Sequence, residues 1–155
     1  MIILSIDPGT EQSAFVLWDH SNQILYDKGI ISNIELLEKL EYYSADKEID
    51  CQVVIEMIAS YGMAVGREVF ETVYWIGQFM HAWRNKNPAI LIYRKSIKMH
   101  HCHSLKANDS NIRQALIDRF GEPGTKKNQG KLYGISKDIW SAFAIAVYYG
   151  DTHLN

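Results

Sequence analysis

Apolar and polar positions alternate along this chain in two distinct periods. Short runs rich in β-branched residues and bounded by turn residues predict five strands, at residues 1–7, 13–19, 23–31, 52–56 and 89–93. Apolar residues at helical spacing predict four helices, one beginning after Ser32 and the others at residues 65–84, 111–120 and 136–150. Three strands followed by strands that alternate with helices (β-β-β-α-β-α-β-α-α) indicate the α/β class, a mixed five-stranded sheet with helices on both faces.

The predicted helix ends carry recognisable caps. Ser32 and Glu35 have the spacing of a capping box. Asn108 or Asp109 is positioned to cap the third helix, which Gly121 ends. Ser136 is the expected cap of the last helix.

Size and composition fit one globular domain over residues 1–155, of which 47% are hydrophobic. No apolar run reaches the ~20 residues of a membrane span, and no signal sequence is visible, so we expect a cytoplasmic protein without a membrane partner. The chain is too short for the two-domain nucleotide-binding proteins whose first strand ends similarly, so no nucleotide cofactor is expected. The net charge of −2 argues mildly against nucleic acid, but carboxylates that hold cations contribute to it.

Three acids stand where predicted strands end or helices begin: Asp7, Glu56 and Asp138. The element order is similar to that of the RNase H-like fold, in which such positions converge. Clustered carboxylates repel one another, and hard divalent cations such as Mg²⁺ or Mn²⁺ relieve the repulsion. Two such ions can activate water and stabilise the leaving oxygen of a phosphodiester. Taken singly, Asp7 has an alternative explanation in a bond to its own turn, and Asp138 is equally explained by its place at a helix start.

Several segments resemble the RuvC family of Holliday junction resolvases. Residues 6–13 resemble the family's first motif, residues 54–56 its second acid, and residues 138–146 its closing motif. Residues 56–72 are similar to RuvC-like proteins encoded by phages and prophages of Gram-positive bacteria.

This resemblance implies a homodimeric, metal-dependent endodeoxyribonuclease that cleaves Holliday junctions and other branched DNA in phage recombination or replication. It implies two Mg²⁺ or Mn²⁺ ions per site, with Asp7 bridging both, Glu56 and Asp138 each holding one, and 5′-phosphate products. Two other functions stay open: another RNase H-like nuclease that cuts flaps or RNA–DNA hybrids, and a weakly active or inactive junction-binding module.

Two positions depart from the family pattern. Ser141 stands where the family usually carries a fourth carboxylate, and it would be a weak neutral metal ligand. Tyr61 is the nearest substitute for an aromatic residue that the family often inserts into the junction.

Basic residues form two candidate DNA contacts. One patch contains Arg94, Lys95, Lys98 and Lys106, and the other contains Lys126, Lys127 and Lys131. Contacts to phosphates and plain solvated surface both explain such patches. Arg67 is a further candidate near the proposed site. Four aromatic residues exceed one core face of the helix at 65–84 and mark it as the expected dimer surface: Tyr74, Trp75, Phe79 and Trp83.

Overall fold

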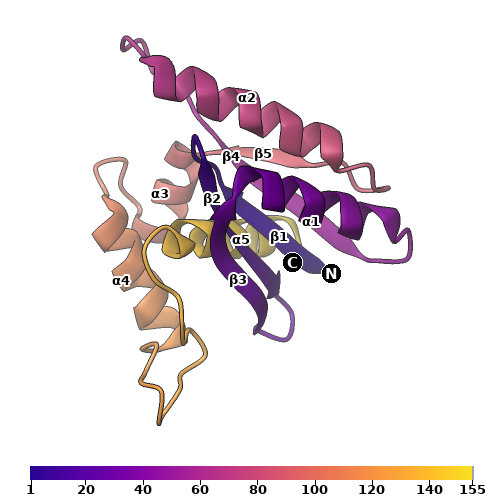
Figure 1. Ribbon diagram of the computed structural model, residues 1–155. Helices are drawn as coiled ribbons and strands as arrows, with labels where there is room; N and C mark the ends of the chain where they lie inside the picture. Colours follow the sequence, from indigo (N-terminus) through magenta and orange to yellow (C-terminus); the bar gives the residue numbers. More distant parts are fainter. Residues whose placement is uncertain (155) are drawn as a thin grey trace.

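The computed structural model describes residues 1–154, which contain one mixed sheet in the order β3-β2-β1-β4-β5 (Figure 1). The strands are β1 (Ile2–Asp7), β2 (Gln12–Asp19), β3 (Ile24–Ser32), β4 (Cys51–Met57) and β5 (Ile90–Tyr93). The first three strands form an antiparallel meander, whereas β4 pairs in parallel with both β1 and β5. The central position of β1 places its carboxyl end beside that of β4.

Helices cover both faces of this sheet (Figure 1). They are α1 (Asn33–Ala45), α2 (Arg67–Ala82), α3 (Arg94–Cys102), α4 (Asp109–Phe120) and α5 (Ile139–His153). One core joins α1 and α2 to one face, and a second core joins α3, α4 and α5 to the other. No helix in residues 1–154 is long and apolar enough to cross a membrane.

The predicted fold class is confirmed, and the structure adds one helix. The segment after β5 forms α3, a short basic helix in which only Ile97 is buried. With so few apolar residues, α3 has no helical periodicity by which the sequence could have revealed it.

The start of α5 also differs from expectation. Asp138, and not Ser136, is the N-cap residue, while the Ser136 carbonyl accepts a hydrogen bond from the Ile139 amide. The two other predicted caps are confirmed, because Ser32 and Glu35 form a capping box and the Asn108 side chain accepts from the Asn111 amide.

The surface predicted on α2 needs correction. Phe79 and Trp83 are buried against the sheet, and the Trp83 indole donates to the Asn87 carbonyl. Tyr74 is exposed, as expected of a surface residue. Phe79 and Trp83 therefore belong to the core beneath the α1–α2 layer and not to the dimer surface that the sequence predicted.

Side chains along the central strands alternate between the two faces of the sheet, and this alternation places Asp7 and Glu56 on the face that α5 covers. On β1, Leu4 and Ile6 face α1 and α2, whereas Ile3 packs into the α5 core. Asp7 continues the Ile3 series, because side chains two residues apart share a face. Glu56 likewise follows Val54, which lies in the α5 core. Since Ile6 pairs with Ile55, the two acids occupy the next positions of adjacent strands.

Candidate active site

A buried polar network fixes the turn that follows Asp7. Gly9 allows this turn, because a Cβ there would stand 2.3 Å from the Gln12 carbonyl oxygen. The Ser13 hydroxyl accepts from the Gly9 amide at 3.1 Å and donates to Asn33 Oδ1 at 2.6 Å. The side-chain amide of Asn33 in turn donates to the Gly9 carbonyl at 3.0 Å. Asp7 is thus held by a turn that is braced against the start of α1.

A second buried contact holds α5 against β1. The hydroxyl of Ser5, which is fully buried, donates to the Ala142 carbonyl at 2.6 Å. This bond joins the strand position two residues before Asp7 to the first turn of α5. It therefore fixes the position of Asp138 and Ser141 relative to Asp7.

The chain enters α5 through an unusual backbone conformation. Lys137 has φ of 48°, in the left-handed region that non-glycine residues rarely adopt. Asp138 follows as the N-cap residue, yet its side chain makes no capping hydrogen bond. The exposed Asp138 carboxylate is thus not used for capping, which weakens its explanation as a plain helix start.

The three acids interact electrostatically. Burial, followed by the charges of Glu56 and then Asp138, raises the pKa of Asp7 from 3.8 to about 7. Arg94 and the Ser141 hydroxyl act in the opposite direction on the pKa of Asp7. Burial also raises the pKa of Glu56, against the lowering effects of Arg94 and Lys98. A negative charge at Asp7 is therefore costly unless a cation is near.

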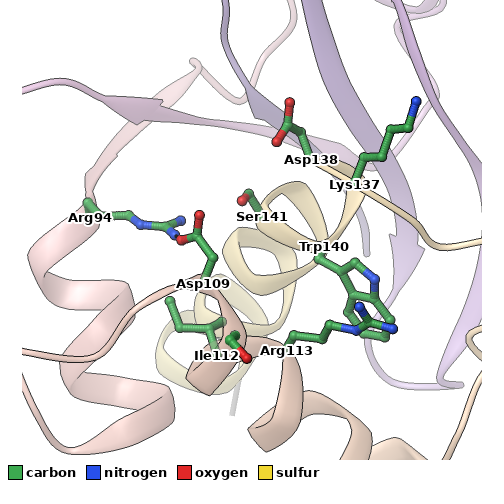
Figure 2. A pocket seen from close by; sticks show the side chains of 9 residues that line it. Arg94, Asp109, Ile112, Arg113, Lys137, Asp138, Trp140 and Ser141 are labelled. Carbon is green, nitrogen blue, oxygen red and sulfur yellow. Dashed lines mark hydrogen bonds and ion pairs between the residues drawn. The ribbon is translucent and has the colours of Figure 1, made fainter.

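Arg94 forms an ion pair with one acid of this cluster. Its guanidinium lies 3.3 Å from Glu56 and also forms an ion pair with Asp109 at the start of α4. Figure 2 shows Arg94 pointing at Asp109, with Asp138 and Ser141 nearby on α5. The sequence had marked Arg94 as a DNA contact, whereas its partners in the structure are two carboxylates.

The donor chemistry of the cluster suits Mg²⁺ or Mn²⁺. Asp7, Glu56 and Asp138 offer carboxylate oxygens, the ligands that hard cations prefer, and their repulsion is of the kind that a cation relieves. As the side chains stand, no group of three His, Cys, Asp or Glu within residues 1–154 is spaced to hold a metal ion. The contact with Arg94 holds Glu56 in an ion pair in this arrangement.

Three clefts run past these groups. One of about 330 Å³ lies between the β1–β2 turn and α5 and contains Asp7 and Asp138. The next, of about 280 Å³, is shown in Figure 2 and contains Asp138, Ser141 and Arg94. The third, of about 330 Å³, contains Arg94 and Tyr61. Neighbouring clefts share Asp138 and then Arg94 as lining residues, so the three clefts follow one another in a band past Asp7, Asp138 and Arg94.

Part of the first basic patch lies on this band. Lys95 and Lys98 line the third cleft with Tyr61, and the Lys95 ammonium stands 5.7 Å from the centre of the Tyr61 ring. Lys106 lies beyond the end of α3 and lines a different cleft, with Asn111. Lys95 and Lys98 therefore line one cleft and Lys106 another, although the sequence presented the three as one patch.

The other predicted DNA contacts lie away from the three clefts. Lys126 and Lys127 are exposed in the loop between α4 and α5. Lys131 donates to Gln23 in the β2–β3 turn, at the end of the sheet opposite Asp7. Arg67 pairs with Glu71 on the surface of α2. The role of these four residues in DNA binding stays a prediction.

The sequence did not reveal three groups that shape the site. Asn33 braces the turn after Asp7, Asp109 binds Arg94, and Arg113 lines the second cleft with its guanidinium 5.1 Å from the centre of the Trp140 ring. Their only signals were a polar residue at a helix start and charges four positions apart on α4, and both are common in surface helices.

Comparisons with known proteins identify the fold of this chain. No protein-family model matches the chain, and no curated protein matches its sequence. A solved structure of Thermus thermophilus RuvC superposes with a TM-score of 0.69 over 97% of this chain and 96% of that one, at 13% identity. The structure of T. thermophilus RuvC in complex with a Holliday junction substrate gives a TM-score of 0.68 over 97% and 93% of the two chains, at 12% identity. The chain therefore has the fold of RuvC, which is the RNase H-like arrangement expected from its sequence.

Proposed function

We propose that this protein is a divalent-metal-dependent endonuclease that cleaves Holliday junctions and related branched DNA. The observation that carries the proposal is the convergence of Asp7, Glu56 and Asp138, at a place where burial, followed by the charges of Glu56 and Asp138, raises the pKa of Asp7 to about 7. Acids that repel one another at a cleft are typical of catalytic sites that bind cations. The fold shared with RuvC adds support, because one such neighbour is in complex with a Holliday junction substrate.

Each acid has a distinct part in this proposal. Asp7 and Glu56 would hold Mg²⁺ or Mn²⁺ from adjacent strands, Asp138 would do so from the start of α5, and Ser141 would add a weak neutral ligand. When bound, the ions supply Lewis-acid stabilisation of the phosphodiester and an activated water. The turn at Gly9 and the Ser5 anchor fix the backbone that carries Asp7 and the start of α5, so that metal binding would require movement of the acid side chains and not of the backbone.

The DNA backbone follows the band of clefts. Lys95 and Lys98 contact phosphates on one side of the acids, and the exposed ring of Tyr61 packs against a base or sugar at the branch. This binding is largely independent of sequence and weakens as salt rises.

The test is cleavage of a labelled four-way junction by wild type, Asp7→Asn, Glu56→Gln and Asp138→Asn in Mg²⁺, Mn²⁺ or EDTA. We expect each variant to lose cleavage and keep junction binding, because the substitutions remove metal ligands and leave the phosphate contacts intact. Asp118→Asn, at an exposed carboxylate on α4, is the matched control and should cut normally. Native-rate cleavage by Asp7→Asn would exclude the proposed chemistry.

Ser141 favours one alternative, a junction-binding module with little or no activity. The position next to Asp7 carries a hydroxyl where a carboxylate would complete the ligand set. Junction binding without cleavage in Mn²⁺ would support this alternative. Preference for a flap or an RNA–DNA hybrid over the four-way junction would instead identify another nuclease of the same fold.

Symmetric cleavage of a junction requires two active sites, so the proposal includes a homodimer. The exposed face of α2 supports it, because Phe70, Val73, Tyr74 and Met80 stand out from the helix. Replacing Phe70 and Tyr74 with Ser should yield monomers in light scattering and leave the fold intact. The proposal also places the protein in the cytoplasm of a bacterial host, with a phage or prophage origin.

A further inference from the structure

Arg94 is held between two acids from different elements. Glu56 lies one residue before the end of β4, Asp109 begins α4, and the guanidinium contacts both. The pair with Glu56 is mostly buried, with side-chain exposures of 22% for Arg94 and 15% for Glu56, whereas Asp109 is 80% exposed. The contact with Glu56 is therefore little screened by solvent, and the contact with Asp109 is screened strongly.

The position of Arg94 in its helix is unfavourable by itself. It is the first residue of α3, where the helix dipole disfavours a positive charge. The N-cap residue, Tyr93, makes no side-chain capping bond that would offset this. The acids thus account for the placement of Arg94, since the guanidinium contacts the carboxylates of both Glu56 and Asp109.

We propose that Arg94 is an internal counter-ion that a divalent cation must displace from Glu56, with Asp109 retaining the guanidinium afterwards. The inference rests on the proposed metal site and adds a residue that sets its affinity. In the metal-free protein, Arg94 neutralises part of the carboxylate cluster and preserves the fold. On metal binding, Glu56 would release the guanidinium of Arg94 and take up the divalent ion. The ion pair with Asp109 would keep the guanidinium beside the second cleft.

The exchange makes metal binding weaker than the acids alone would allow. A cation that enters the cluster must break the contact between Arg94 and Glu56, and the guanidinium charge repels it. Arg94 is in this sense a positioning residue, because it acts on the metal through Glu56.

The test measures Mn²⁺ affinity of the full chain without DNA, by electron paramagnetic resonance or calorimetry. Arg94→Met should bind Mn²⁺ about tenfold tighter than wild type, the order expected for removing one competing charge in a partly buried site. Its melting temperature in EDTA should fall, and the rise on adding Mn²⁺ should exceed that of wild type. Arg94→Lys, which keeps the charge, should stay closer to wild type in both measurements.

Arg119→Met is the matched control, because Arg119 also binds a carboxylate, Asp151, but far along α4 from the acids. It should lower stability without changing Mn²⁺ affinity. An Arg94→Met affinity equal to that of wild type would overturn the inference and leave the proposed function standing. Mn²⁺ binding that persists unchanged in Asp7→Asn, or is absent from both wild type and Arg94→Met, would contradict the proposed metal site and the inference together.

Discussion

Replacing Asp7 with Asn should make the metal-free protein more stable, and more so as the pH rises. Asn has nearly the shape of Asp but carries no charge. It therefore removes the cost of a buried negative charge next to Glu56 and Asp138, while the turn at Gly9 and the Ser5 anchor stay in place. The same substitution abolishes cleavage in the proposed function, so stability and activity should move in opposite directions.

The magnitude follows from the pKa of Asp7. A tenfold change in proton affinity is worth about 1.4 kcal/mol, so raising the pKa from 3.8 to about 7 corresponds to roughly 4 kcal/mol. Between pH 4 and 7, the folded protein holds a proton on Asp7 that the unfolded chain has released. Stability of the wild type therefore falls as the pH rises through this window, and the loss is complete above the folded pKa. Relaxation and water entry reduce the effect, so we expect a gain of about 2–4 kcal/mol for the variant at pH 8.

The assay is urea unfolding in EDTA at pH values from 4.5 to 8.5, followed by circular dichroism. The difference in unfolding free energy between Asp7→Asn and wild type should widen from pH 4.5 to pH 8, whereas Asp118→Asn should track wild type throughout. Mg²⁺ at pH 8 should stabilise wild type more than Asp7→Asn. A difference that does not change with pH would refute the argument, because it would show that Asp7 titrates alike in the folded and unfolded chains.

Further substitutions test the remaining parts of the site. Ser141→Asp should raise cleavage in Mg²⁺ relative to Mn²⁺, since it supplies a charged ligand beside Asp138, and unchanged wild-type activity would mean that the ligand set is already complete. Replacing Lys95 and Lys98 with Ala should weaken junction and duplex binding alike and reduce the salt slope by about one per lost phosphate contact, in filter binding across salt concentrations. Adding Lys106→Ala should reduce the slope further only if the DNA crosses the neighbouring cleft. Ser13→Ala should cost about 1–3 kcal/mol in urea unfolding, because it leaves the Gly9 amide without its buried partner, and a loss near zero would show that the turn does not need the clamp.

Much of the architecture was readable from local patterns. The five strands, the capping box at Ser32 and the end of α4 at Gly121 follow from periodicity and from residues within a few positions of one another. The same reading identified Asp7 and Glu56 at strand ends. Such features are local, so the sequence alone determines them.

Contacts between distant segments were decided only by the tertiary structure. The sequence marked Arg94 as a DNA contact, but the meeting of α3, β4 and α4 gives it two carboxylate partners. Phe79 and Trp83 looked like surplus apolar residues until the α1–α2 layer buried them. The Ser5 hydrogen bond to Ala142 spans 137 positions, and no local pattern encodes it. Periodicity specifies which residues share a face of one element, whereas the partner of that face depends on how the whole chain packs.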